Sequence, residues 1–314
     1  MSRHASMVGQ AEDYLASRRK LGLQLKIEGQ QLLSFAQFAD DIRHRGPLTN
    51  ELALRWAILP KGAAPEYWSR RLGIVRRFAK YRFLFEPKTE VPPERLLGPA
   101  CRRPTPYIYS EDDICELVRA CSDLGPAGGL RPLTYATFFG LLASTGLRSV
   151  EALRLNRSDV DFSTGTLCVT ESKFHKSRLV PVHSSTLHAL GAYAAQRDRR
   201  HQLPRAQTFF LTEKGTSLKY GKMFATFQEL RKVLGWSKKN PSPRIHVLRH
   251  AFAVRRLLAW YTAGADVDQK IPTLSTYLGH VKVSDTYWYL TAVPELLAVA
   301  SSRYEREFGR RARP

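Results

Sequence analysis

The stretch GTLCVTESKFHKSRLVPV, residues 165–182, contains two short runs typical of β-strands. Residues 165–170 and 178–182 are rich in apolar and β-branched side chains, and the polar segment 172–177 separates them. The pattern predicts two antiparallel strands joined by a polar turn. Most of the sequence on either side has the periodicity of amphipathic helices, so we expect a mainly α-helical fold with a small antiparallel β-sheet.

The sequence changes character between residues 86 and 106, which contain six prolines. Proline lacks a backbone N–H and disrupts both helices and interior strands, so this stretch is typical of a linker. We expect an N-terminal helical domain at 1–86, a proline-rich linker at 87–107, a larger domain at 108–293, and a C-terminal helix with a basic tail at 294–314.

Two helices can be placed at the beginning of the larger domain. Ser110 and Asp113 have the spacing of a capping box, and Ile114 and Leu117 continue an amphipathic pattern beyond it. Residues 135–142 are nearly all apolar and predict a second, more buried helix.

The chain is strongly basic. It has 49 Lys and Arg against 28 Asp and Glu, a formal net charge of +21 and a pI near 10.1. With 43% hydrophobic residues it has enough apolar material for a packed core, which excludes disorder of the whole chain. The charge indicates a polyanionic partner.

The cysteines and the apolar segments indicate the compartment. The four cysteines are too widely spaced for paired zinc motifs and are expected to be reduced. No apolar run approaches the roughly 18 to 20 residues of a membrane span, so we expect a soluble cytoplasmic or nucleoid-associated protein.

The basic charge is dense on one helix of the N-terminal domain. Trp68, Leu72, Val75 and Ala79 form an apolar stripe at helical spacing, and basic residues surround it. Like charges this dense repel one another without a counter-anion, so nucleic-acid contact is favoured over a merely solvated face. The candidate contacts are Arg70, Arg71, Arg76, Arg77, Lys80 and Arg82.

Four segments of the larger domain contain residues that could carry chemistry: STGLRSVEAL at 144–153, ESKFHKSRLVPV at 171–182, HVLRHAF at 246–252 and YLGHVKVSDTYWYL at 277–290. In the third, His246 and Arg249 share a helix face and could bind one anion. His246 and His250 have the spacing of a metal pair, but Arg249 beside them would repel a divalent cation. We therefore expect no metal.

Taken together and in this order, the segments resemble the tyrosine recombinase family, the DNA strand-exchange enzymes of the phage integrase, Cre and Xer type. The resemblance extends from about Ile108 to the end of the chain and, weakly, to the N-terminal domain, which would be a SAM-like core-binding domain. It implies a site-specific recombinase that cuts and rejoins DNA through a covalent 3′-phosphotyrosine without cofactor, metal or ATP.

The resemblance also implies partners. Double-stranded DNA would be the substrate, bound by a homo-oligomer, a dimer or a tetramer, with companion recombinases as an option. The stretch between Arg249 and His280 is longer than in the Xer type, which favours a recombinase of a mobile element.

By resemblance, Tyr289 is the nucleophile, because a tyrosine hydroxyl can attack phosphorus and retain the bond energy. Arg148 and Arg249 would stabilise the charge on the non-bridging oxygens. Lys173, in the predicted turn, would protonate the leaving oxygen as general acid. Lys176 shares that turn and is the alternative acid.

By the same resemblance, His246 and His280 would bond the phosphate and assist proton transfer. Glu151, three residues after Arg148, would orient that arginine or be a solvated charge. Tyr287 and Tyr277 also lie near the histidine and are expected to be packing residues.

The C-terminal residues 294–314 carry an apolar stripe at steps of four, typical of a helix that docks on a neighbouring protomer or packs on its own domain. Rival functions are a non-catalytic DNA-binding relative of a recombinase, a type IB topoisomerase or a telomere resolvase. A metal-dependent nuclease is the least favoured.

Overall fold

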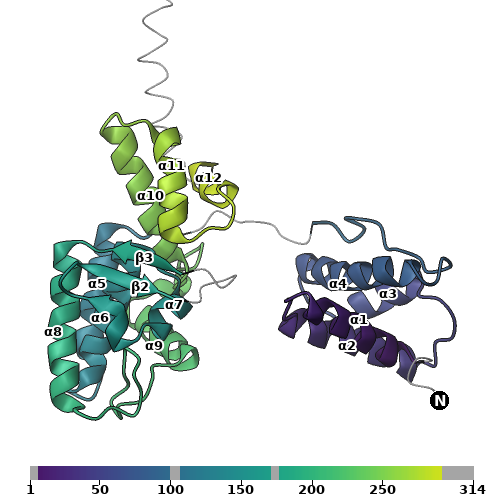
Figure 1. The fold of residues 1–314 in the computed structure, drawn as a ribbon, viewed down its shortest axis with the longest axis horizontal. Coiled ribbons are helices and arrows are strands. Elements are labelled where there is room, and N and C mark those ends of the chain that lie inside the picture. Colours follow the sequence, from purple (N-terminus) through teal and green to yellow (C-terminus); the bar gives the residue numbers. More distant parts are fainter. Residues whose placement is uncertain (1–5, 100–106, 171–176, 292–314) are drawn as a thin grey trace, which may run out of the picture. The chain divides into compact units, whose positions relative to one another are not determined.

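The computed structural model describes residues 6–99, 107–170 and 177–291. The chain divides into two compact units, Met1–Pro104 and Thr105–Pro314 (Figure 1). The described part is mainly helical and contains a three-stranded antiparallel sheet, so the predicted fold class is confirmed. None of its helices combines the length and the apolar character needed to cross a membrane.

The first unit is a bundle of helices around one apolar core. The core contains Phe35 from the second helix, Trp56 from the third, and Leu72 and Val75 from the fourth. The predicted stripe of the fourth helix thus faces inward at these two positions and at Ala79, which is also fully buried. Pro65 begins that helix, where its missing N–H costs nothing. The helices are α1 (Met7–Lys20), α2 (Lys26–Asp41), α3 (Asn50–Ala57) and α4 (Pro65–Phe83).

Arg71 does not belong to the exposed basic face of α4. Its side chain lies in the core, stacked 3.6 Å above the ring of Trp56, and it donates hydrogen bonds to the Trp56 carbonyl at 2.8 Å and to Gln31 Oε1 at 3.1 Å. The prediction that Arg71 contacts DNA is wrong, because its side chain extends from α4 toward Trp56 of α3 and is bound there. Arg70, Arg77 and Lys80 are exposed, and their contact with DNA stays a prediction.

Arg76 and Arg82 are half-buried and make contacts within the first unit. Arg76 donates from Nε to the Pro92 carbonyl at 2.7 Å and from Nη2 to the Pro93 carbonyl at 2.6 Å. Arg82 forms an ion pair with Glu86 at 3.0 Å.

The proline-rich stretch begins as part of the first unit. Ser69 Oγ donates to the Gly98 carbonyl at 2.8 Å, and Val91 and Leu97 pack on the core of this unit. The predicted linker at 87–107 is therefore too long at its N-terminal end, since residues up to Gly98 are anchored to the helices. The other predicted boundaries stay predictions.

The second unit is built around α6 (Leu130–Thr145), which packs against α5 (Glu111–Ala120), α8 (Ser184–Arg200) and α10 (Val247–Thr262) (Figure 1). Phe138 and Phe139 of α6 are fully buried. The remaining helices are α7 (Ser149–Arg154), α9 (Tyr220–Val233), α11 (Val267–Leu278), α12 (Ser284–Thr291) and the short 3₁₀ turns Cys121–Asp123, Arg157–Asp159 and Trp236–Lys238.

The capping box that begins α5 is confirmed. Ser110 Oγ accepts from the Asp113 N–H at 3.0 Å, and Asp113 accepts from the Ser110 N–H at 2.9 Å. Tyr107 and Lys239 also donate to the Asp113 carboxylate, which fixes the entry to the second unit.

The two predicted strands are β2 (Thr166–Val169) and β3 (Arg178–Pro181), paired antiparallel with Val169 opposite Arg178. A third strand, β1 (Val160–Asp161), was not predicted because two residues give no alternation to recognise; it pairs with β2. The predicted turn between these strands, with Lys173 and Lys176, lies outside the described residues, as does the predicted C-terminal helix at 294–314.

α10 connects two apolar cores of the second unit. Leu248 and Ala251, at its beginning, belong to the main core, whereas Leu257, further along, packs on Ile271 and Leu274 of α11 in a smaller one. α10, α11 and α12 therefore form a group at one end of the unit (Figure 1). This group holds α12 beside the beginning of α10.

Replacement of Arg71 by alanine should destabilise the first unit, because the change removes two hydrogen bonds and a stacked cation from the core. We expect a loss of about 1–3 kcal/mol in the free energy of unfolding. Urea unfolding of Arg71→Ala and of the exposed control Arg77→Ala would measure it. Equal stability of the two variants would contradict the placement of Arg71.

Candidate active site

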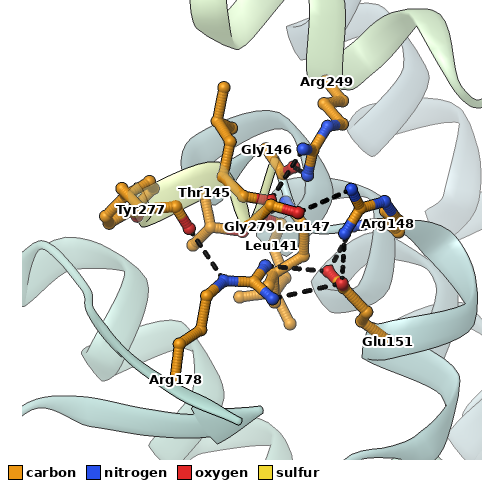
Figure 2. Close-up of polar contacts among 11 residues, drawn as sticks. Leu141, Thr145, Gly146, Leu147, Arg148, Glu151, Arg178, Arg249, Tyr277 and Gly279 are labelled. Carbon is orange, nitrogen blue, oxygen red and sulfur yellow. Dashed lines mark hydrogen bonds and ion pairs between the residues drawn. The ribbon is translucent and has the colours of Figure 1, made fainter. Parts of the chain in front are cut away.

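Arg148 lies at the junction of α6 and α7, where a glycine turns the chain. α6 ends at Gly146, whose φ of +64° lies in the left-handed region. A Cβ atom at this position would stand 2.6 Å from the ring of Phe252 and 3.0 Å from Leu278. The turn favours glycine on both grounds, and it places the guanidinium of Arg148 beside the end of α11 (Figure 2).

Glu151 is buried in the first turn of α7 and binds two arginines. Its carboxylate accepts from the backbone N–H of Arg148 at 3.0 Å and from Arg148 Nη1 at 2.7 Å. Arg178 of β3 adds a two-pronged contact, Nη1 to Oε1 at 3.1 Å and Nη2 to Oε2 at 2.9 Å. Glu151 is therefore no solvated charge.

The pKa of Glu151 reflects these bonds. Burial alone would raise it, but the hydrogen bonds and positive charge of Arg178, followed by the bonds from Arg148, outweigh burial and lower the pKa of Glu151 to about 2. The carboxylate is thus ionised throughout the physiological range and holds both guanidiniums as a fixed anion.

Arg249 is buried near the beginning of α10 and joins the ends of two other helices. Its Nη1 donates to the Gly146 carbonyl at 2.8 Å and its Nη2 to the Leu278 carbonyl at 2.7 Å. Burial and the nearby charge of Arg148 lower the pKa of Arg249 to about 10, so it remains a cation at neutral pH. A charged side chain this buried requires such partners.

The last carbonyl groups of α11 bind three arginines. Those of residues 277, 278 and 279 accept hydrogen bonds from Arg178 at 2.8 Å, Arg249 at 2.7 Å and Arg148 at 2.9 Å, in that order (Figure 2). These carbonyls form the negative end of the helix dipole and have no intrahelical donor. The helix end therefore gathers three cations at one place.

His280 and Tyr289 lie on the continuation of α11 and on α12. The ring centroids of the two residues are 6.0 Å apart, and His280 Nδ1 shares a 2.7 Å hydrogen bond with Thr286 Oγ1. Burial, followed by the charges of Arg249 and Arg148, lowers the pKa of His280 to about 4. His280 is therefore neutral at pH 7.

Tyr289 is only 3% exposed. Burial raises the pKa of its hydroxyl, while the positive charges of Arg249 and Arg148 act in the opposite direction. The hydroxyl thus lies beside the arginines, which favour its deprotonated form once it is no longer buried.

His246 and His250 complete the ring contacts around Tyr289. His246 precedes α10, remains accessible to solvent, and packs edge-on against His250 at a centroid distance of 5.0 Å. The ring centroid of His250 in turn lies 5.2 Å from those of both Tyr289 and Trp288. Partial desolvation and the charges of Arg249 and Arg148 lower the pKa of His246.

The structure thus brings together the predicted residues Arg148, Glu151, Arg249, His280 and Tyr289, with His246 beside them. Their catalytic roles stay predictions at this point. Lys173 and its alternative Lys176 lie outside the described residues.

The two competing tyrosines have other surroundings. Tyr277 stacks on Phe252 at 5.7 Å and donates its hydroxyl proton to the Pro181 carbonyl at 3.3 Å, and burial raises the pKa of Tyr277 to about 12. Tyr287 is 42% exposed, and because it lies two positions before Tyr289 on α12 it belongs to another face of that helix. The contacts of Tyr277 therefore agree with the prediction that it is a packing residue.

Arg178 was not among the predicted site residues. The available signal was strand alternation: Arg178 and the buried Val180 are two residues apart and face the same side of β3, whereas Leu179 between them is exposed. An arginine on the inner face of a strand requires an acceptor, and Glu151 supplies it.

Comparison with known proteins gives one family. Residues 109–295 match the model of the phage integrase family. The chain is 42% identical over 306 residues to the putative integrase/recombinase y4rB of Sinorhizobium fredii, covering 95% of this chain and 96% of that protein. It is 30% identical to the tyrosine recombinase XerD of Caulobacter vibrioides, covering 76% of this chain and 74% of that protein.

A solved structure shares the fold at low sequence identity. The Tn1549 transposon integrase in complex with transposon right end DNA superposes with a TM-score of 0.70 at 15% identity, covering 96% of this chain and 99% of that chain.

The low pKa of His280 predicts a loss of stability on acidification. The unfolded histidine binds a proton as the pH falls through about 6.5, whereas the native one resists until about 4, so protonation favours the unfolded state between these values. Stability should be fully present above pH 6.5 and fall below it.

Replacing His280 by asparagine, whose amide can still bond Thr286, should make this decline shallower. Thermal unfolding between pH 7 and pH 4.5 would measure it, with the exposed His188→Asn as the matched control. An unchanged decline in His280→Asn would show that another group causes it.

Proposed function

Because the chain belongs to the phage integrase family, the tyrosine recombinases that cut and rejoin DNA, we propose that it recombines DNA at specific sites through a covalent 3′-phosphotyrosine on Tyr289. One observation supports the mechanism above the others. Tyr289 is buried beside His280, where the charges of Arg249 and Arg148 act on its hydroxyl and three arginines meet at the end of α11.

In the proposed cleavage step, the Tyr289 oxygen attacks phosphorus, the bond to the 5′ oxygen breaks, and the phosphotyrosine bond replaces it. Arg148 and Arg249 hold the non-bridging oxygens, whose charge increases in the transition state. Each guanidinium has five N–H donors, of which the contacts above use only some, so donors remain for the phosphate.

Two proton transfers accompany this step. The tyrosine proton must leave, and His280 is suited to accept it, since it is neutral and its Nε2 is unprotonated when Nδ1 donates to Thr286. His246 bonds the phosphate from the other side. Lys173 protonates the leaving 5′ oxygen, and religation runs the same steps in reverse.

We propose double-stranded DNA as the partner and a homo-oligomer as the active form. One tyrosine cuts one strand, and exchange between two duplexes involves four strands, so a complete reaction requires four active sites. The exposed arginines of α4 would contribute phosphate contacts, which give affinity without reading the sequence.

The recombinase would belong to a mobile element. This proposal rests on the long stretch between Arg249 and His280 and on the relative y4rB, which is named an integrase/recombinase and is more similar than XerD.

The duplex that this protein cuts can be found by covalent capture. DNA fragments that together cover the sequence flanking the gene are incubated with the protein, and the reaction is stopped with detergent. The fragments that remain covalently bound to the protein are then sequenced from the end that is attached to it. A nicked form of the captured fragment, below called the captured duplex, then traps the adduct because the short cut strand diffuses away.

Replacing Tyr289 by phenylalanine should abolish the adduct on the captured duplex while binding is retained, because only the nucleophilic oxygen is lost. Tyr287→Phe is the matched control and should form the adduct as the wild type does. Adduct formation by Tyr289→Phe in a denaturing gel would refute the assignment.

Replacing Arg148 by lysine should slow cleavage by roughly 10²-fold or more, since one ammonium cannot replace the planar two-pronged contact. Binding should weaken only modestly, because this is one phosphate contact of several. Single-turnover cleavage and a binding titration would separate the two effects. A variant that binds poorly but cleaves at the normal rate would place Arg148 outside the reaction.

A further inference from the structure

We propose that Arg178 is a positioning residue of the reaction: it locks Glu151, and through it Arg148, to the end of α11 and to the strand that follows the lysine turn. The inference rests on the proposed function of the site. Arg178 would not touch the DNA itself.

The first support is the number and direction of its contacts. Arg178 grips both carboxylate oxygens of Glu151 with its two terminal nitrogens and donates from Nε to the Tyr277 carbonyl at 2.8 Å (Figure 2). The side chain is only 11% exposed. One planar group therefore fixes β3, α7 and α11 relative to one another, with little freedom left to rotate.

The second support is the number of N–H donors that Arg148 keeps because Arg178 also binds Glu151. Glu151 is held from the far side by Arg178, so Arg148 needs only its backbone N–H and Nη1 to complete the contact. Its Nη2 bonds the Gly279 carbonyl, and its remaining donors stay available. Without Arg178, the buried carboxylate would have Arg148 as its remaining charged partner.

The third support is electrostatic. With Arg178 present, two arginines share the single charge of Glu151, and Arg148 keeps a net attraction for phosphate. With Arg178 removed, the negative charge of Glu151 would neutralise that of Arg148, because Arg148 would be the one cation still paired with this buried carboxylate. The positive charge available to the transition state would fall.

The fourth support is steric. Gly279, with φ +68°, packs against the guanidinium so closely that a Cβ atom would stand 2.7 Å from Arg178 Nη1 and 2.9 Å from Cζ. The peptide that leads to His280 therefore rests on Arg178. The same side chain that orients Arg148 also supports the turn before His280.

The last support is its place in the chain. Arg178 is the first residue of β3 and lies opposite Val169, five residues after Lys173. It is the point at which the chain that carries the proposed general acid is tied to the arginines.

The test is Arg178→Gln on the captured duplex. We expect the single-turnover cleavage rate to fall by roughly 10- to 100-fold, while the affinity for the duplex changes by less than about threefold. The control is Arg157→Gln, which removes a guanidinium from another ion pair of the same unit, with Asp198 at 3.1 Å. Arg157→Gln should cleave within about twofold of the wild type.

A double-mutant cycle distinguishes positioning from a loss of stability. If Arg178 acts mainly through Glu151, Arg178→Gln should slow cleavage much less in a Glu151→Gln background than in the wild type, because only its support of the Gly279 turn is left to lose. The proposal would be overturned if the fold-loss in cleavage rate of the double variant equalled the product of the fold-losses of Arg178→Gln and Glu151→Gln. Arg178→Lys keeps the charge but loses the fork, so its rate should fall between those of the wild type and Arg178→Gln.

Thermal unfolding of each variant shows whether it is folded, and Arg178→Lys carries the test if Arg178→Gln does not fold. If the wild type forms the adduct and Arg178→Gln cleaves at the same rate, the positioning role is refuted but the proposed function is not. Absence of an adduct with the wild type, or its persistence in Tyr289→Phe, would refute the proposed function instead.

Discussion

The geometry of the candidate site depends on the C-terminal end of α11, where the carbonyls of residues 277–279 bind Arg178, Arg249 and Arg148. Three guanidiniums close together repel one another, and this arrangement needs acceptors that approach from a common side. A helix end supplies them, because its last carbonyls have no intrahelical donors and carry the negative end of the dipole. The arginines come from three different elements, so the helix end also joins α7, β3 and α10.

Two glycines make this meeting possible. Gly146 ends α6 and Gly279 ends α11, both with positive φ, and both offer their carbonyls to arginines. At each position a side chain would collide with a neighbour, the Phe252 ring in one case and the Arg178 guanidinium in the other. The helix ends can therefore approach the arginines only as glycine turns, and Arg249 bridges α6 and α11 through the carbonyls of Gly146 and Leu278.

Much of the site could be predicted from the sequence, because the order and spacing of the motifs identify Arg148, Arg249, His280 and Tyr289 without knowledge of the fold. What could not be predicted depends on which side of an element faces inward. Arg71 differs from its exposed neighbour Arg70 by one residue, and only the packing of α4 on Trp56 shows that it is a core cation. Arg178 was missed for the same reason, since its partner Glu151 is 27 residues away in the sequence.

The choice of acceptors has a consequence for the chemistry. Carboxylates would hold the three arginines more strongly, but each would cancel a full charge that the phosphate is to meet. Carbonyl groups fix the same geometry with partial charges, and among the described residues that contact these arginines Glu151 alone is a full anion. The site therefore keeps a surplus of positive charge, and its cost adds to that of burial: burial first, and then the charge of Arg148, lowers the pKa of Arg249. A phosphate that gains negative charge during the reaction would offset this cost most in the transition state, which is where stabilisation accelerates a reaction.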